Sequence, residues 1–258
     1  SAATGTVTTV GNIYSPQLNN SRSLRIYLPP SYYKNSAKRY PVLYMHDAQN
    51  LFNASTAFGG VEWGVDETIN RLVGTGAMDE VIVVGIDNNA DRINEYTPCC
   101  DAQYGGGKIN QYEGFIINTV MPYVNQSYRT LTGSQNTALM GSSLGGLASF
   151  YIARRNPAVF AKSGGMSSSF WWNNRYMVNT VVAASGKVPG KFYIDAGTLN
   201  DGLADTTAMR DAMAADGYVQ GADLYYYVAQ GASHNESSWA ARLEVPLKYL
   251  FPWGSTAY

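Results

Sequence analysis

The amino-acid sequence predicts one α/β domain built around a mostly parallel sheet. Apolar runs of strand length alternate along the chain with longer segments in which apolar residues recur every three to four positions. The chain has 258 residues and contains no internal repeat, low-complexity linker or charge run. We therefore expect a single domain over residues 1–258.

Seven segments have the length and composition of strands. Several of them, such as "EVIVVGID", are continuous apolar runs without polar alternation, which is the pattern of strands covered on both faces. The expected strands are 24–29, 41–47, 80–87, 136–141, 160–167, 191–197 and 223–231.

Five segments between these strands have the apolar spacing of helices. One of them ends before Pro157, because the residue before a proline is disfavoured in a helix. The glycine-rich stretch "QYGGGK" at 103–108 is expected in a long surface loop. The expected helices are 63–74, 110–126, 143–155, 203–216 and 236–250.

Composition and charge exclude several classes of partner. Charged residues make up 14% of the chain, the net charge is −1, and no basic cluster is longer than a pair such as Arg154-Arg155, so we expect neither nucleic acid nor an anionic membrane surface as a partner. No apolar stretch approaches the roughly 18 residues of a membrane span. The chain begins with Ser1 rather than Met, and together with the low charge this predicts a mature secreted or periplasmic protein.

The two cysteines, Cys99 and Cys100, are adjacent. Their spacing does not match a metal site and rules out a long-range disulfide within one chain. Two interpretations stay open, namely free thiols in a loop and a vicinal disulfide formed in an oxidising compartment.

The stretch "MGSSLGGLA" at 140–148 contains the pattern G-x-S-x-G with Ser143 at its centre. It joins an expected strand to an expected helix, which is the context of a nucleophile elbow. Small residues let strand and helix cross closely, and the start of the helix supplies N–H groups and a positive dipole end where an oxyanion would form. We therefore predict that Ser143 is a nucleophile, whereas Ser142 lies one residue before the tip of the turn.

A serine hydroxyl needs a base, and the base needs an acid to orient it. His234 in "GASHNESSW" lies after the last expected strand, where the chain order Ser-Asp-His places the base. For His46, at the end of an early strand, we expect a structural role. Asp201 follows a strand and lies at the edge where catalytic residues of such sheets collect, so it is the expected acid. Asp195, inside that strand, is the alternative.

Several segments together resemble the esterase-D-like esterases of the α/β-hydrolase fold. They are "VLYMHDAQNLF", "VIVVGIDNNADRINEYTP", "DAGTLND", "ASHNESSW" and the long stretch that contains the Ser143 turn. The resemblance runs from about residue 20 to 251. It implies an α/β-hydrolase fold with a mostly parallel central sheet flanked by helices, and one catalytic domain over 1–258. That family includes feruloyl esterases, siderophore esterases, S-formylglutathione hydrolases and mycolyltransferases.

The resemblance also implies roles for individual residues. Ser143, Asp201 and His234 match the family's nucleophile, acid and base. The loop after "YMH" matches the oxyanion loop, so the backbone N–H groups of Gln49 and Leu144 are expected to hold the oxyanion. Residue 48 departs from the pattern, because it is alanine where relatives usually carry glycine.

Four aromatic residues are candidates for the substrate pocket. Trp171 and Trp172 fall where the resembling family builds its pocket wall, and Trp63 and Tyr96 are expected to line it too. Trp239, five residues after the expected base, is interpreted as packing that fixes the last helix.

These observations predict a serine carboxylic-ester hydrolase that uses no metal and no organic cofactor. The expected substrates are aromatic, feruloyl-like or short acyl esters of carbohydrate. A siderophore esterase, an acyltransferase of the mycolyltransferase type and a non-catalytic binding module are the alternatives. No cluster of Arg or Lys lies near the motifs to hold an anionic catecholate–iron complex, which disfavours the first alternative.

Overall fold

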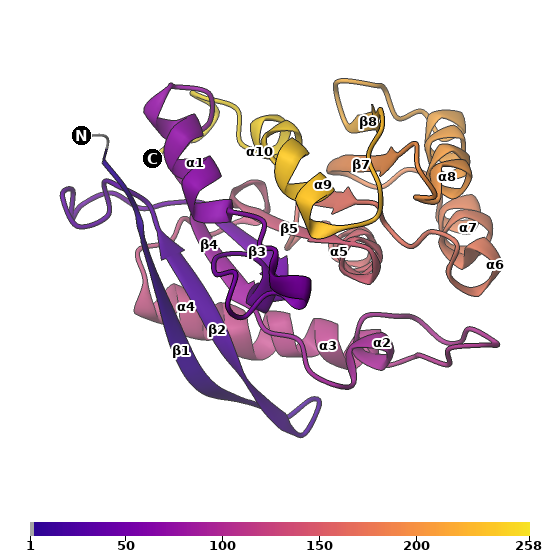
Figure 1. Cartoon of the computed structure of the whole chain (residues 1–258), viewed down its shortest axis with the longest axis horizontal. Coiled ribbons are helices and arrows are strands. Elements are labelled where there is room, and N and C mark those ends of the chain that lie inside the picture. The colour runs from indigo at the N-terminus through magenta and orange to yellow at the C-terminus, as the bar shows by residue number, and fades with distance from the viewer. Residues whose placement is uncertain (1–2) are drawn as a thin grey trace.

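A twisted sheet of eight strands forms the centre of the computed structural model, which describes residues 3–258. The strand order is β1-β2-β4-β3-β5-β6-β7-β8 (Figure 1). β2 pairs antiparallel with β1 and with β4, and all other neighbours are parallel. The strands are β1 (Thr6–Ser15), β2 (Asn20–Leu28), β3 (Val42–His46), β4 (Ile82–Ile86), β5 (Thr137–Ser142), β6 (Lys162–Met166), β7 (Lys191–Gly197) and β8 (Leu224–Ala229).

All seven expected strands are present, and the predicted fold class is confirmed. The sequence missed β1, which is the first edge strand of the sheet. Most of its residues are exposed, so its sequence TVTTVGNIYS lacks the apolar run or clean alternation that marks a strand packed on a core.

The five expected helices are also present. The segment expected at 110–126 continues through a π-helical turn, η3, and the segment expected at 236–250 is divided at Leu243. These helices are α1 (Val65–Gly74), α3 (Ile109–Phe115), η3 (Ile116–Val120), α4 (Met121–Ser127), α5 (Leu144–Arg155), α8 (Leu203–Ala215), α9 (Glu236–Arg242) and α10 (Glu244–Leu250).

The sequence missed several short helical segments in the connections. They include the consecutive segments α6, η5 and α7, and in α6 three residues in a row have positive φ. Across residues 3–258, no helix is long and apolar enough to cross a membrane. The missed segments are η1 (Ala48–Asn50), η2 (Phe58–Gly60), α2 (Arg92–Glu95), η4 (Ser134–Asn136), α6 (Trp172–Tyr176), η5 (Met177–Val182) and α7 (Ala183–Ser185).

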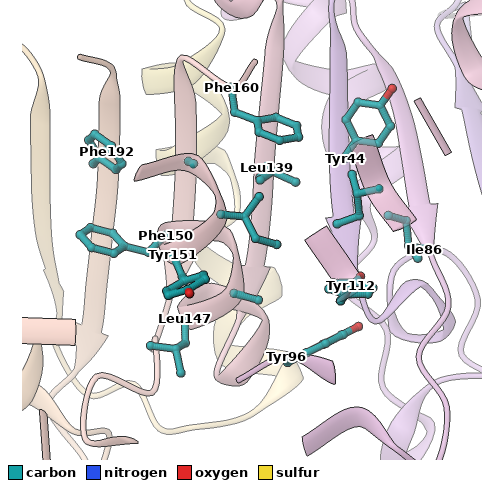
Figure 2. Packing of buried hydrophobic residues seen from close by; sticks show 14 of the residues in the cluster. Tyr44, Ile86, Tyr96, Tyr112, Leu139, Leu147, Phe150, Tyr151, Phe160 and Phe192 are labelled. Carbon is teal, nitrogen blue, oxygen red and sulfur yellow. The ribbon is translucent and has the colours of Figure 1, made fainter. Parts of the chain in front are cut away.

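Helices cover both faces of the sheet and create two apolar layers. On one face, side chains of α3, η3, α4, α5 and α8 pack against the strands, and Figure 2 shows aromatic residues of this layer such as Tyr44, Tyr112 and Phe150. The helices α1, α9 and α10 lie on the other face (Figure 1), and buried apolar residues of these helices pack there against the strands. The continuous apolar runs of the central strands are explained by this burial on both faces.

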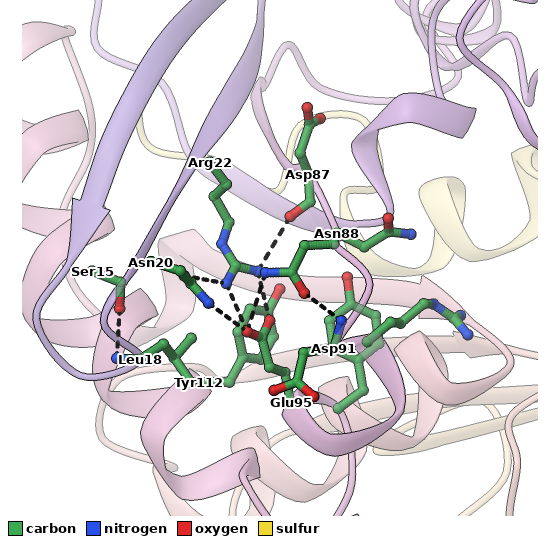
Figure 3. A network of polar contacts seen from close by, with 12 residues as sticks. Ser15, Leu18, Asn20, Arg22, Asp87, Asn88, Asp91, Glu95 and Tyr112 are labelled. Carbon is green, nitrogen blue, oxygen red and sulfur yellow. Dashed lines mark hydrogen bonds and ion pairs between the residues drawn. The ribbon is translucent and has the colours of Figure 1, made fainter.

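A buried ion pair ties β2 to the segment that follows β4. Arg22 donates from Nη1 and Nη2 to the two carboxylate oxygens of Glu95, at 2.7 and 2.9 Å (Figure 3). Nη1 also lies 3.4 Å from the backbone oxygen of Asp87. Both charged side chains are almost fully buried, so each requires the other as a partner. This pair therefore fixes the start of the loop that borders the candidate site.

His46 is the last residue of β3, and its imidazole is buried. Nδ1 lies 2.7 Å from the hydroxyl of Tyr112, and Nε2 has no partner within residues 3–258. Burial lowers the pKa of His46 to about 4, so the ring is neutral at neutral pH. This environment agrees with the expected structural role.

His46 should make the stability of the fold depend on pH. Its pKa is about 4 in the folded protein and roughly 6.5 in the unfolded chain, so between these values only the unfolded chain takes up the proton. The stability that neutral His46 contributes is present above pH ~6.5 and is lost as the pH falls towards ~4, by about 3 kcal/mol over the whole window.

Urea unfolding of the wild type and of His46→Gln at several pH values in this window would measure the effect. The free energy of unfolding should fall more steeply with decreasing pH in the wild type, because only the wild type contains His46. The carboxylates titrate in both proteins, so their contribution is the same in the two curves. Equal slopes would show that His46 is not held neutral by the fold.

Candidate active site

Ser143 stands at the tip of the turn between β5 and α5. Its backbone has φ 58° and ψ −124°, a strained conformation for a residue with a side chain. The backbone N–H of Ser143 donates to the oxygen of Met166 on β6, and its carbonyl accepts from Gly146 and Leu147 in α5. The turn is thus held by strand and helix together.

The glycines beside Ser143 allow β5 and α5 to cross closely. A Cβ at residue 141 would lie 2.7 Å from the carbonyl carbon of Gly145, which is closer than real Cβ atoms approach. A Cβ at residue 146 would overlap Ser168, two residues after β6. The requirement for small residues, expected from the sequence, therefore has a steric cause at both positions.

Ser143, His234 and Asp201 form a continuous line of hydrogen bonds. Ser143 Oγ lies 3.0 Å from His234 Nε2, and His234 Nδ1 lies 2.7 Å from Asp201 Oδ1. Burial alone would raise the pKa of Asp201, but hydrogen bonds from His234, Ser167 and the backbone of Gly197 lower it below its ordinary value. An ionised carboxylate only accepts, so Nδ1 carries the hydrogen and Nε2 accepts from the serine hydroxyl.

The carboxylate of Asp201 is fixed by groups on three elements. Its Oδ2 accepts from Ser167 Oγ at 2.5 Å and from the backbone N–H of Gly197 at 2.6 Å. The Ser167 hydroxyl in turn accepts from Trp239 Nε1 and Arg242 Nη2, each at 2.9 Å. These hydrogen bonds orient the carboxylate so that its other oxygen, Oδ1, faces His234 Nδ1.

Asp195 lies beneath this arrangement and does not contact His234 among the hydrogen bonds of residues 3–258. It is fully buried in β7, where Arg242 donates to both of its oxygens at 2.9 and 3.0 Å. Tyr193 and the backbone N–H of Ser167 donate to it as well. Its surroundings are those of a structural carboxylate, and the alternative that Asp195 orients the base has no hydrogen bond to support it among residues 3–258.

The loop after β3 brings the backbone of Gln49 to the same place as the start of α5. Neither the N–H of Gln49 nor that of Leu144 has an acceptor within residues 3–258. Gln49 lines a hollow that also contains Ser143 and His234, and Leu144 follows Ser143 directly. Both groups are therefore free to donate to an oxygen beside Ser143.

The alanine at position 48 is accommodated by the neighbouring strand. Ala48 is fully buried in η1, and its methyl group faces Gly85 of β4, where a Cβ would come within 2.8 Å of the alanine Cβ. The left-handed residue of the loop is Asp47, with φ 57°, and not Ala48. The methyl group thus imposes no unusual dihedral angles on residue 48.

Two hollows meet at Ser143 and His234. The aromatic hollow, of about 280 Å³, is lined by Ile93, Tyr104, Leu144, Ser169, Trp171 and Trp172. The polar hollow, of about 660 Å³, is lined by residues that include Gln49, Asn50, Thr56, Phe58, Asn88 and Asn235. Arg92 lines both hollows. An ester held at Ser143 could therefore extend in two directions with different chemistry.

Three rings form the wall of the aromatic hollow. The ring of Tyr104 lies 5.7 Å from that of Trp171 and 6.4 Å from that of Trp172. Trp171 is 40% exposed, whereas Trp172 is buried and donates from Nε1 to the oxygen of Pro98. Sequence reasoning missed Tyr104, because the loop 103–108 has no periodic pattern and is positioned by glycines with positive φ.

Trp63 and Tyr96 do not line either hollow, so their expected place in the pocket is wrong. Trp63 is 2% exposed and packs in the core against Trp239 with ring centroids 5.9 Å apart. Tyr96 is fully buried, and its hydroxyl accepts from the backbone N–H of Asp47. Both rings pack beneath the loops that border the site. Their complete burial stabilises the fold, because large aromatic side chains remove the most apolar surface from water. Trp239 packs edge-on against His234, as well as in the core.

Cys99 and Cys100 are joined by a vicinal disulfide, which decides between the two interpretations left open. The pair lies at the base of the loop that carries Tyr104. Cys100 Sγ is 4.0 Å from the oxygen of Gly106, and the backbones of Asp101 and Gly105 exchange two hydrogen bonds. The disulfide thus lies at the base of the loop that brings Tyr104 to the aromatic hollow.

Relatives of known sequence agree with this architecture. The family model described as "Putative esterase" matches residues 15–250. The protein YbbA of Bacillus subtilis is 28% identical over 160 residues, which cover 60% of this chain and 59% of YbbA. An endo-1,4-beta-xylanase/feruloyl esterase of Xylanibacter ruminicola is 23% identical over 92% of this chain and 30% of its own length. The chain thus spans under two thirds of these relatives.

Solved structures share the fold. A ferulic acid esterase has a TM-score of 0.75 at 22% identity, covering 96% of this chain and 98% of its own. The enterobactin esterase FES from Shigella flexneri has a TM-score of 0.74 at 16% identity, covering 97% of this chain and 60% of its own. The family match over residues 15–250 confirms the resemblance stated from the sequence motifs. The chain therefore belongs to this esterase family and has the α/β-hydrolase fold.

Proposed function

We propose that the protein is a serine esterase that cleaves aromatic acyl esters carried on carbohydrate. The observation that supports the chemistry most directly is the hydrogen-bond line from Ser143 Oγ through His234 to Asp201, at 3.0 and 2.7 Å. This line ends where the two hollows meet, so a bound ester would place its carbonyl carbon at the serine hydroxyl.

In the proposed first step, Ser143 Oγ attacks the ester carbonyl carbon while its proton passes to His234 Nε2. The electron pair of the carbonyl bond moves onto its oxygen, which the N–H groups of Gln49 and Leu144 stabilise. When the tetrahedral intermediate collapses, the bond to the alcohol oxygen breaks and that oxygen takes the proton from His234. Asp201 stabilises the imidazolium between these transfers.

The second step repeats the first with water. Water gives a proton to His234 Nε2 as its oxygen bonds to the acyl carbon, and collapse breaks the bond to Ser143 Oγ, which regains the proton. The free acid and the original enzyme result. The two reaction steps require no metal and no organic cofactor, because each proton moves between Ser143, His234, water and the leaving alcohol.

The two hollows support the substrate class. A phenolic acyl ring matches the aromatic hollow, where Tyr104, Trp171 and Trp172 offer faces and edges for stacking. The polar hollow has amide and hydroxyl side chains together with Phe58, which is 77% exposed, and this combination suits a sugar with its hydroxyl groups and apolar face. The similar ferulic acid esterase and xylanase/feruloyl esterase are named for this class of substrate, which supports the proposal.

The proposed location outside the cytoplasm rests on two features. Charged residues are scarce, at 14% of the chain. The disulfide between Cys99 and Cys100 is of a kind that persists in oxidising compartments.

Ser143→Ala should reduce turnover of p-nitrophenyl acetate by at least on the order of 10⁴-fold while circular dichroism stays unchanged, because no other group replaces the nucleophile. Ser36→Ala is the control and should leave turnover unchanged, because Ser36 is exposed and lines neither hollow. A phosphonate ester should label Ser143. Labelling at Ser142 or Ser169, or an active Ser143→Ala enzyme, would refute the assignment.

Asp201→Asn should lower turnover by on the order of 10⁴-fold, because an amide at this position no longer stabilises the imidazolium. Asp195→Asn should instead lower the free energy of unfolding by roughly 3–5 kcal/mol, since it removes the buried carboxylate to which Arg242 donates at 2.9 and 3.0 Å. Steady-state kinetics and urea unfolding on both variants would measure the two effects. An exchange of the two outcomes would make Asp195 the acid.

The two hollows should affect different substrates. Trp171→Ala should raise KM for methyl ferulate by about 2- to 10-fold, the size expected from the roughly 0.5–1.5 kcal/mol of an aromatic contact. Phe58→Ala should raise KM by a similar factor for a feruloylated oligosaccharide but leave KM for methyl ferulate unchanged. Tyr33→Ala is the control, because Tyr33 is 75% exposed and lines neither hollow. Acetylated xylan and enterobactin complete the panel. A clear preference for enterobactin would replace the proposed substrate class with a siderophore ester.

A further inference from the structure

The loop that carries Gln49 contains a buried carboxylate, and Arg92 holds it. Arg92 donates from Nε to Asp47 Oδ1 at 2.8 Å and from Nη2 to Asp47 Oδ2 at 2.9 Å. Asn88 Nδ2 donates to the same Oδ1 at 2.6 Å. Asp47 is 4% exposed, and Arg92 approaches it from the side of the two hollows.

The same two loops are joined a second time by Gln49. Its amide nitrogen donates to the backbone oxygen of Asn88 at 2.9 Å, and its amide oxygen accepts from the Asn88 N–H at 3.0 Å. The position of the Gln49 backbone therefore depends on the loop from Asn88 to Arg92. Asp47 also has left-handed backbone angles, which its hydrogen bonds to Arg92 and Asn88 help to maintain.

The carboxylate of Asp47 also lies against the first turn of α5. Asp47 Oδ2 is 3.4 Å from the position of a Cβ on Gly145, one residue after Leu144. This end of α5 carries the positive end of the helix dipole, which would favour negative charge on an ester oxygen at Ser143. An unpaired carboxylate here would oppose that charge. Burial tends to raise the pKa of Asp47, but the charge and hydrogen bonds of Arg92 hold it below its ordinary value, so the carboxylate is ionised.

We propose that Arg92 is a positioning residue for the oxyanion site: it neutralises Asp47, so that this carboxylate can hold the Gln49 loop without opposing negative charge at Ser143. Asp47 accepts three hydrogen bonds that hold the Gln49 loop. Arg92 cancels the negative charge of Asp47, which would otherwise repel an oxyanion at Ser143. This inference rests on the proposed function of Ser143 and the Gln49 loop.

Arg92 lines both hollows, so a direct contact with the substrate is the competing role. The two roles differ in what happens when Asp47 also loses its charge. If Arg92 acts on Asp47, then Asp47→Asn should largely repair the defect of Arg92→Gln. If Arg92 acts on the substrate, the double variant should be as poor as Arg92→Gln.

The experiment measures kcat and KM for p-nitrophenyl acetate, a neutral substrate, on the full chain. Arg92→Gln should lower kcat by about 10²-fold, the scale of losing one oxyanion donor, and should leave KM within about threefold. Arg92→Lys keeps the positive charge but loses the paired hydrogen bonds of the guanidinium to Asp47, and it should retain most of kcat. Asp47→Asn/Arg92→Gln should recover at least about tenfold over Arg92→Gln, as coupling between contacting residues predicts.

Arg155→Gln is the control, because Arg155 forms an ion pair with Glu113 at the opposite end of α5 and lines neither hollow. It should leave kcat unchanged. If Arg92→Gln does not fold, the double variant alone still decides, with kcat expected within about tenfold of the wild type. A double variant that folds but stays about 10²-fold impaired, or a loss confined to KM, would overturn the proposal.

Failure of the proposed function is distinguishable from failure of this inference. A wild type that does not turn over p-nitrophenyl acetate and is not labelled by a phosphonate at Ser143 would refute the serine mechanism. A wild type that does both, with Arg92→Gln equally active, would refute only the role of Arg92.

Discussion

The close crossing of β5 and α5 is the constraint on which the site depends. Ser143 has positive φ, and nothing in its own side chain favours that conformation. It is imposed by hydrogen bonds to β6 on one side and α5 on the other, with glycine at the point where strand and helix touch. The parallel pairing of β3, β5 and β6 then brings the loop after β3 to the same edge. The geometry at Ser143 is thus a consequence of sheet packing.

Buried charges around this edge are arranged in pairs. Asp195 accepts from Arg242, Asp47 accepts from Arg92, and Glu95 accepts from Arg22. A buried carboxylate without such a partner would destabilise the fold and would tend to take up a proton. These pairs keep the carboxylates in fixed positions, so the groups near Ser143 are oriented before any substrate arrives. Such preorganisation is the main means by which protein dipoles stabilise developing charge.

Aromatic residues divide into those that face the site and those that support it. Trp171 and Tyr104 are partly exposed, whereas Trp63 and Tyr96 are buried behind the loops. The difference follows from the segments that carry them. Glycines with positive φ position the loop 103–108 so that Tyr104 stacks on Trp172, whereas Trp63 lies two residues before α1 and its indole is buried in the core. A buried ring beneath a loop gives that loop a rigid base without touching the ligand.

The sequence by itself determined the alternation of strands and helices and the elbow around Ser143. It also singled out His234 and Asp201 at strand ends, because continuous apolar runs and glycine spacing are local signals. It did not reveal β1, whose exposed residues carry no such signal. Only the tertiary structure decided that Trp63 and Tyr96 are core, that Tyr104 and Phe58 border the hollows, and that Arg92 pairs with Asp47, 45 positions away. Which side chains meet across loops depends on how the sheet brings distant segments together, and no local pattern encodes that.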